Sequence, residues 1–122
     1  MSSSFRALKS YAVFNAVVAD STKYSEATDV TGLMSVEYDI SWSSGSSLSG
    51  AITAEVLIAK PDDNPVNWVW QTLDLGSTVA ISGTSGSHTI VFTVVPMGML
   101  RLKYTRSTGA GLLTATIKGK GW

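Results

Sequence analysis

The sequence contains no cysteine and only one histidine, His88. The lack of cysteine excludes disulfide bonds, thiolate metal sites and cysteine nucleophiles, so stability has to come from packing. A serine triad would need His88 as its base beside a nucleophile and an acid. Because this histidine follows a Ser-Gly turn at the expected start of a strand, we expect a surface role for it, no catalytic residue and no enzyme activity.

Long apolar runs are also missing. No segment reaches the roughly 18 consecutive apolar residues that a membrane-spanning helix needs, and the apolar stretch from Tyr11 to Ala19 is short and interrupted by Asn15. The sequence therefore predicts no membrane partner. Its 122 residues, 44% of them apolar, suit one globular domain over residues 1–122, with residues 1–10 as a possible N-terminal arm.

Acidic residues are absent from the last part of the chain. All nine lie at or before Asp74, against four bases, whereas five bases and no acid occur from Leu75 onward. The first part thus carries a formal charge of −5 and the second a charge of +5. Two interpretations stay open. Strands distant in sequence pair within one fold and cancel these charges locally, or oppositely charged faces of neighbouring molecules attract in an assembly.

The most regular stretch runs from Met34 to Ser43. Large apolar side chains alternate with serine and acidic residues along it, and only a period of two places all the apolar groups on one side. This pattern predicts a half-buried strand. A slip of one residue would expose Tyr38 and Trp42 and bury Asp39, so its register is strongly fixed.

Other strand-forming segments follow at intervals of about ten residues, separated by clusters of Gly, Pro, Asn, Asp and Ser. The expected strands cover about residues 11–19, 34–43, 51–60, 67–73, 77–82, 88–95, 99–106 and 111–118, with a short possible strand at 27–30. Residues 43–50 are expected to form a flexible loop, and the last two strands a hairpin across Ser-Thr-Gly-Ala-Gly. The sequence therefore predicts an all-β fold, an antiparallel β-sandwich of jelly-roll or immunoglobulin-like type with about eight strands.

Several clusters contain residue types that occur in metal, catalytic or phosphate sites, but none has the spacing or surroundings that such a site requires. Asp62, Asp63 and Asn64 offer adjacent oxygens without the alternating spacing of a calcium loop. Glu37 and Asp39, with Glu55 possibly near, have no apolar pocket to raise the pKa of one carboxyl, as glycoside hydrolysis requires. The glycine-rich turns open no helix that would cradle a phosphate. We expect no metal, no cofactor and no nucleic-acid partner.

Trp68 and Trp70 are the aromatic pair of greatest interest. Residues two apart on a strand project from the same face, roughly 7 Å from each other. Such a pair could form a platform for sugar rings, or it could pack in the core or at a subunit contact, where aromatic side chains contribute most. Both interpretations remain open at this stage.

The segment from Tyr11 to Val18 is apolar on both sides of its expected strand. Strands of this kind belong in a core or beneath a neighbouring subunit, and a C-terminal tryptophan after Lys-Gly-Lys-Gly can anchor in a neighbour's pocket. Contacts with other subunits or with a larger particle are therefore expected at Phe5, Tyr11, Phe14, Arg101, Lys103 and Trp122.

The C-terminal half resembles a group of small β-sandwich proteins of tailed bacteriophages. The resemblance lies in an asparagine-tryptophan strand after an acidic turn, a glycine-rich turn, and an arginine-tyrosine strand that leads to a Gly-Lys-Gly ending. These stretches are DDNPVNWVWQTL (62–73), SGTSGSH (82–88) and LRLKYTRSTGAGLLTATIKGKG (100–121). The resemblance covers about half of the chain, and Pro65 departs from the acidic turn of the group.

This resemblance implies a non-enzymatic structural protein located in the virion, either a capsid decoration protein or a tail or neck subunit. Its expected partners are copies of itself, as a homo-oligomer, and other virion proteins. The alternative is a carbohydrate-binding module that recognises a host glycan through Trp68 and Trp70.

Overall fold

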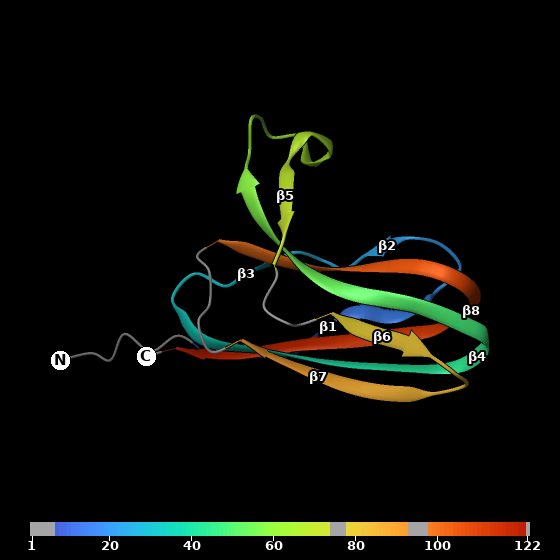
Figure 1. Cartoon of the computed structure of the whole chain (residues 1–122). Helices are drawn as coiled ribbons and strands as arrows, with labels where there is room; N and C mark the ends of the chain where they lie inside the picture. The colour runs from blue at the N-terminus through green and yellow to red at the C-terminus, as the bar shows by residue number, and fades with distance from the viewer. Residues whose placement is uncertain (1–6, 74–77, 93–97, 122) are drawn as a thin grey trace.

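The computed structural model describes residues 7–73, 78–92 and 98–121. These residues form eight strands, paired antiparallel, and one 3-10 turn, η1 (Pro65–Asn67). The strands are β1 (Ala7–Val18), β2 (Lys23–Tyr24), β3 (Thr28–Asp29), β4 (Leu33–Ala59), β5 (Val69–Thr72), β6 (Val79–Ser82), β7 (Gly86–Phe92) and β8 (Met99–Gly121). The predicted all-β sandwich is confirmed (Figure 1). Within this part of the chain, no helix has the length and hydrophobicity of a membrane span.

Two long strands, β4 and β8, organise the fold. They run antiparallel along each other, from Leu33 opposite Gly121 to Val56 opposite Leu100. This two-stranded ribbon bends over near its middle, so that its halves face each other across the core (Figure 1). Each half forms the centre of one layer, and the sandwich is therefore one sheet folded on itself.

The shorter strands widen each half of this ribbon. In the first layer, β1 pairs with the C-terminal half of β8, and β7 pairs with the N-terminal half of β4. In the second layer, β2 and β3 pair with the N-terminal half of β8, whereas β5 and β6 pair with the C-terminal half of β4. Figure 1 shows the first layer below the second.

The inward faces of both layers share one core. The predicted alternation from Met34 to Ser43 is confirmed for its central residues, since Val36, Tyr38 and Ile40 are at most 1% exposed. The second layer contributes a similar row, which includes Ile52 and Leu102. Each large apolar side chain removed from water in this way contributes about 1.5–3 kcal/mol to stability.

The bend of the ribbon corrects two predictions. Residues 43–50 form no loop, and Met99–Gly121 forms one strand rather than a hairpin, because these two Gly- and Ser-rich segments pair with each other. Ser46 lies opposite Ala110 and Ser49 opposite Thr108, with register shifts between these pairs. Glycine and serine at these positions permit the bulges and unusual dihedral angles of a sharp corner. The same composition is typical of turns, which explains the error.

The strand β1 is longer and less regular than expected. It begins at Ala7, and its first residues pair with Gly119 and Lys120, so residues 7–10 of the expected arm belong to the sheet. Register shifts, together with a positive φ of 49° at Ala16, break the alternation. As a result Val13 and Phe14, although adjacent, are both buried in the core.

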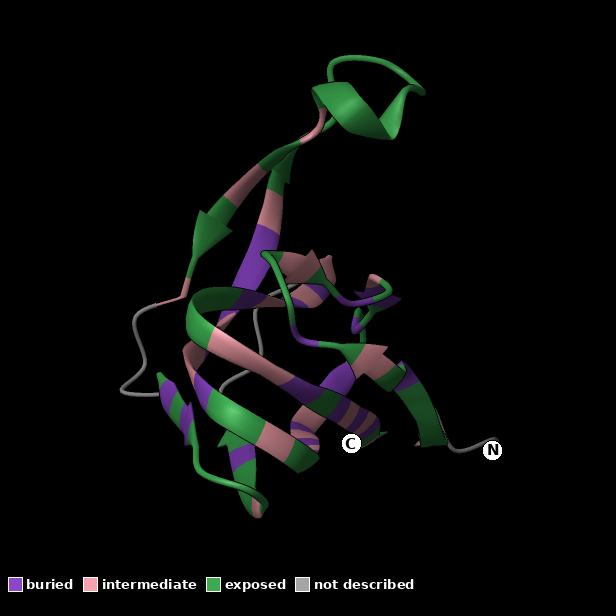
Figure 2. Ribbon diagram, turned by 90° about the vertical axis from the view of Figure 1, so that its right-hand side faces the viewer, coloured by how far each residue is buried: buried purple, intermediate pink, exposed green. Residues whose placement is uncertain are grey.

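A hairpin projects from the second layer where β4 continues beyond the sandwich. Its first strand is the end of β4 and its second is β5, with Leu57 opposite Trp70. Val56 is buried, whereas Ile58, two residues further along the same strand, is 56% exposed. No layer covers the sheet at this point, so the periodicity of the strand persists while its burial ends. Figure 2 shows this hairpin, at the top of the view, as mainly exposed.

Candidate functional site

The projecting hairpin, residues 57–72, displays apolar side chains on a polar surface. Val66 at its tip is 86% exposed, Ile58 is 56% exposed and Val69 is 46% exposed. Single exposed apolar residues are ordinary, but three on one projection are characteristic of a contact surface. This hairpin is the feature of the described residues that is best suited to contact another protein.

The tip of the hairpin is held in a fixed shape by Asp62. Its carboxylate accepts hydrogen bonds from the backbone N–H of Asn64 at 2.8 Å and from the side-chain amide of Asn67 at 2.9 Å, while its carbonyl oxygen accepts one from Nε1 of Trp68 at 2.9 Å. Asn64 then caps the 3-10 turn by accepting a bond from the N–H of Val66. The acidic turn thus shapes the tip.

The base of the hairpin is fixed by a cation between two rings. The guanidinium carbon of Arg101 lies 4.2 Å from the ring centroid of Tyr24 and 4.1 Å from that of Trp70, and its Nε lies 2.8 Å from Oε1 of Glu55. We call Tyr24, Arg101 and Trp70 the Arg101 stack. It joins β2, β8 and β5 with Glu55 of β4, so that the hairpin is attached rigidly to the outer face of the second layer.

The two tryptophans of the hairpin have different neighbours. Trp68 follows the 3-10 turn and precedes β5, whereas Trp70 lies within β5. Nζ of Lys60 lies 4.5 Å from the ring centroid of Trp68, and Arg101 covers a face of Trp70. Both rings are half-buried and lie outside the core. Each ring thus has its own cationic neighbour, and both rings remain partly open to solvent.

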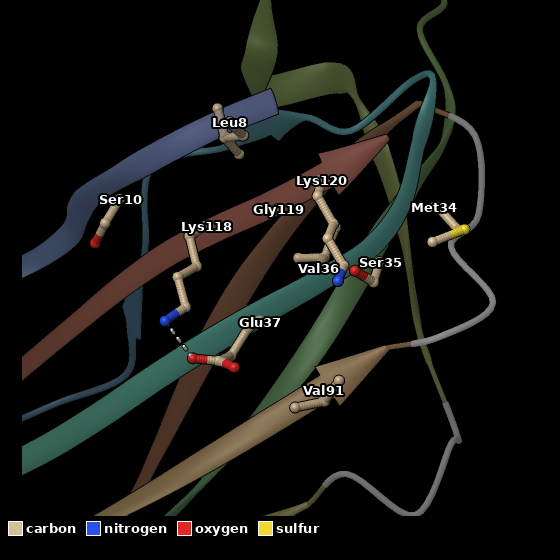
Figure 3. Close-up of a pocket in the computed structure, with 10 residues that line it drawn as sticks. All are labelled: Leu8, Ser10, Met34, Ser35, Val36, Glu37, Val91, Lys118, Gly119 and Lys120. Carbon is tan, nitrogen blue, oxygen red and sulfur yellow. Dashed lines mark ion pairs between the residues drawn. The ribbon is translucent and has the colours of Figure 1, made fainter. Parts of the chain in front are cut away.

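A hollow lies on the opposite side of the molecule, on the outer face of the first layer. It has a volume of about 740 Å³ and is lined by Leu8, Ser10, Met34, Ser35, Val36, Glu37, Val91, Lys118, Gly119 and Lys120. Figure 3 shows that these residues come from neighbouring strands, with Lys118 directed toward Glu37. Glu37, Val91 and Lys118 alternate with core residues and point outward.

Charges in this hollow are only partly paired. Nζ of Lys118 lies 3.0 Å from a carboxylate oxygen of Glu37 and 4.0 Å from one of Asp39. A hydrogen bond from Lys118 to Glu37, together with the charges of both carboxylates, raises the pKa of Lys118. Lys120 is exposed and has no ion pair among the described residues.

Part of the uneven charge of the sequence is an arrangement of neighbouring strands. Glu37 lies opposite Lys118, and Glu55 lies opposite Arg101, in the register of β4 and β8. Acids of the first part of the chain thus pair with bases of the second part within one molecule. Glu55 lies in a different layer from Glu37 and Asp39, so the three carboxylates do not form one site.

The expected contact residues have different environments. Phe14 is 1% exposed, so the chain's own core covers its ring, and this residue is corrected from a contact to a core position. Tyr11 is 37% exposed and its hydroxyl bonds to that of Thr28. Lys103 lies 5.9 Å from the centroid of Tyr24. Phe5 and Trp122 lie outside the described residues.

Other polar candidates occupy surface positions. His88 is exposed in β7, opposite Ile40. Across residues 7–73, 78–92 and 98–121, no three His, Asp or Glu side chains gather in a group that could hold a metal ion. The carboxylate of Asp62, which the sequence offers as a metal ligand, instead accepts hydrogen bonds within its own turn.

Sequence patterns alone did not identify the exposed apolar tip or the hollow. Val66 follows a proline in a polar turn, which gave the only indication that it would be exposed. The hollow depends on the register of four strands, and no local motif encodes that register.

No known protein family and no curated protein matches the sequence. Among solved structures, the chain is similar to the crystal structure of the SPBc2 prophage-derived protein YomS. The two share 16% sequence identity over 97% of each chain, with a TM-score of 0.51. At this identity the comparison shows a common fold.

Proposed function

We propose that this protein is a structural component of a bacteriophage particle, where it associates with itself and with other virion proteins on the capsid or the tail. Two observations support this role. The fold is shared, over almost the entire chain, with a prophage-derived protein. The three C-terminal stretches described above also resemble small β-sandwich proteins of tailed phages.

The projecting hairpin carries the proposal. Its exposed apolar side chains, Ile58, Val66 and Val69, stand clear of the body of the sandwich. The Arg101 stack and the turn around Asp62 hold them in place before any partner arrives. A preformed surface loses little conformational entropy on binding, which favours docking onto a large, repetitive particle.

Particle composition tests this function. Phage particles from a strain that carries the gene are banded in a density gradient, and this protein is detected by mass spectrometry. The proposal expects the protein in the particle band at a fixed ratio to the major shell or tube protein. A second strain with V66D is expected to yield particles with less of it. Recovery only in the soluble fraction would overturn the proposal.

Recognition of a host glycan is the second candidate, because Trp68 and Trp70 lie outside the core and are partly exposed. A glycan array separates the two functions. Carbohydrate binding that is lost in W68A and in W70A would favour this alternative, and an array without signal would exclude it for the glycans present.

A further inference from the structure

We propose that the tip of the projecting hairpin of one copy binds in the hollow of the first layer of a second copy, so that copies join head to tail. This inference rests on the self-association in the proposed function. It specifies which two surfaces of the molecule meet.

The positions of the tip and the hollow support this contact. Figure 1 shows that the hairpin extends from the second layer, away from the first layer. The hollow lies on the outer face of the first layer, so the two surfaces point away from each other. A molecule therefore cannot fill its own hollow with its own tip. A contact between two different surfaces of identical chains is heterologous, and it produces a ring or a filament, which are the arrangements that repetitive particles use.

The tip and the hollow both expose apolar side chains. The tip presents Val66, 86% exposed, next to Pro65. The hollow contains Val91, 55% exposed on β7, and Met34, partly exposed on the neighbouring strand β4. Its volume of about 740 Å³ lies in the range of pockets that enclose small ligands, which is ample for the turn that carries Val66. Contact would remove apolar surface of both copies from water.

The tip and the hollow also carry opposite charges. Asp63 at the tip is exposed and makes no ion pair with another described residue, whereas Asp62 beside it is used within the turn. Lys120 in the hollow is likewise exposed, and Lys118 next to it is already paired with Glu37. The tip thus offers one free carboxylate and the hollow one free ammonium group, and opposite charges of this kind fix the register of an interface.

Charge reversal in both surfaces tests this pairing. The association constant of the full chain is measured by sedimentation equilibrium for the wild type, D63K, K120D and the double variant. Each single reversal is expected to weaken association about tenfold, since repulsion replaces attraction. The double variant is expected to recover most of the loss. E26K, a reversal at another exposed acid, is the matched control and should associate as the wild type does.

The outcomes separate this inference from the proposed function. Wild-type protein that stays monomeric at high concentration would contradict both. Association that is unchanged in D63K and K120D would overturn only the head-to-tail contact. Circular dichroism of each variant confirms that the fold is retained.

Discussion

Arg101 and Glu55 lie directly opposite each other on β8 and β4, with Nε of the arginine 2.8 Å from Oε1 of the glutamate. Glu55 is 7% exposed and paired with Arg101, whose guanidinium group also lies over the rings of Tyr24 and Trp70. A carboxylate this deeply buried needs a cation and hydrogen bonds in place of water. This ion pair therefore holds Arg101 against Trp70 of the hairpin that we propose as a docking surface.

Replacement of Arg101 by methionine is expected to lower the free energy of unfolding by about 1–3 kcal/mol. The variant retains an apolar side chain between Tyr24 and Trp70 but leaves Glu55 unpaired. Urea denaturation measures the effect. Lys103→Met removes a more distant cation from the same ring of Tyr24 and should cost less than about 0.5 kcal/mol. Equal losses in both variants would contradict this account of the hairpin base.

Removal of the Asp62 carboxylate is expected to loosen the tip alone. Asp62→Ala deletes the acceptor for the N–H of Asn64 and the side-chain amide of Asn67, so amide hydrogen exchange at Asn64 should be faster by about tenfold, the equivalent of about 1.4 kcal/mol. Core amides such as that of Ile52 should be unaffected. Asp63→Ala, at a neighbour without such bonds, is the control. If both variants exchange alike, Asp62 does not shape the tip.

Substitution of Gly109 tests the corner of the ribbon. This glycine has a φ of 68°, and an added Cβ would collide with the carbonyl oxygens of Ser46 and Ser47. Gly109→Ala should therefore destabilise the protein by more than about 1 kcal/mol. Gly83 also has a positive φ, of 84°, but its Cβ would meet nothing within 4 Å. A thermal melt in which Gly83→Ala loses as much as Gly109→Ala would disprove close packing at the corner.

The stability of the protein is expected to fall at alkaline pH, because a tyrosine hydroxyl is buried in the core. The hydroxyl of Tyr38 is buried without a hydrogen-bond partner among the described residues, and burial raises the pKa of Tyr38 above its ordinary value of 10.0. Above about pH 10 the unfolded chain releases this proton while the folded chain keeps it. The stability contributed by the neutral hydroxyl is therefore full below pH 10 and is lost as the pH rises, by up to about 1.4 kcal/mol per pH unit.

Tyr38→Phe removes both the buried hydroxyl and its titration. At pH 7 the variant should be as stable as the wild type, or more stable by about 1 kcal/mol. Between pH 10 and 11.5 its stability should fall less steeply. Urea midpoints across this range measure both effects, and identical slopes for the two proteins would contradict the assignment.

The sequence predicted strands more reliably than their connections. Alternation located the N-terminal part of β4 correctly, since Val36, Tyr38 and Ile40 are buried as expected. It did not indicate that Ile58 is exposed while Val56, two residues earlier, is buried, because periodicity describes which way a side chain points and cannot say whether another layer covers it. The corner shows the same limit. A Gly-Ser segment suits either a turn or a bulged bend, and only long-range pairing with residues 107–111 decides between them.

Individual residues of the candidate site could be predicted from the sequence, but their arrangement could not. Arg101, Trp70 and the acidic turn were singled out as residues of interest, but their combination depends on the alignment of β2, β8, β4 and β5. Phe14 was misplaced because bulges in β1 turn two adjacent side chains into the core. Such bulges have no marker in a stretch of valines and alanines.

Directed cross-linking tests the central claim, that the hairpin of one copy meets the first layer of another. Because the chain has no cysteine, V66C and V91C can each be prepared with a single thiol and then mixed under mild oxidation. We predict a disulfide between position 66 of one copy and position 91 of another, identified by mass spectrometry. This disulfide should form faster in the mixture than any disulfide in either variant alone. Cross-links formed only between like positions, or at equal rates in all three samples, would contradict it.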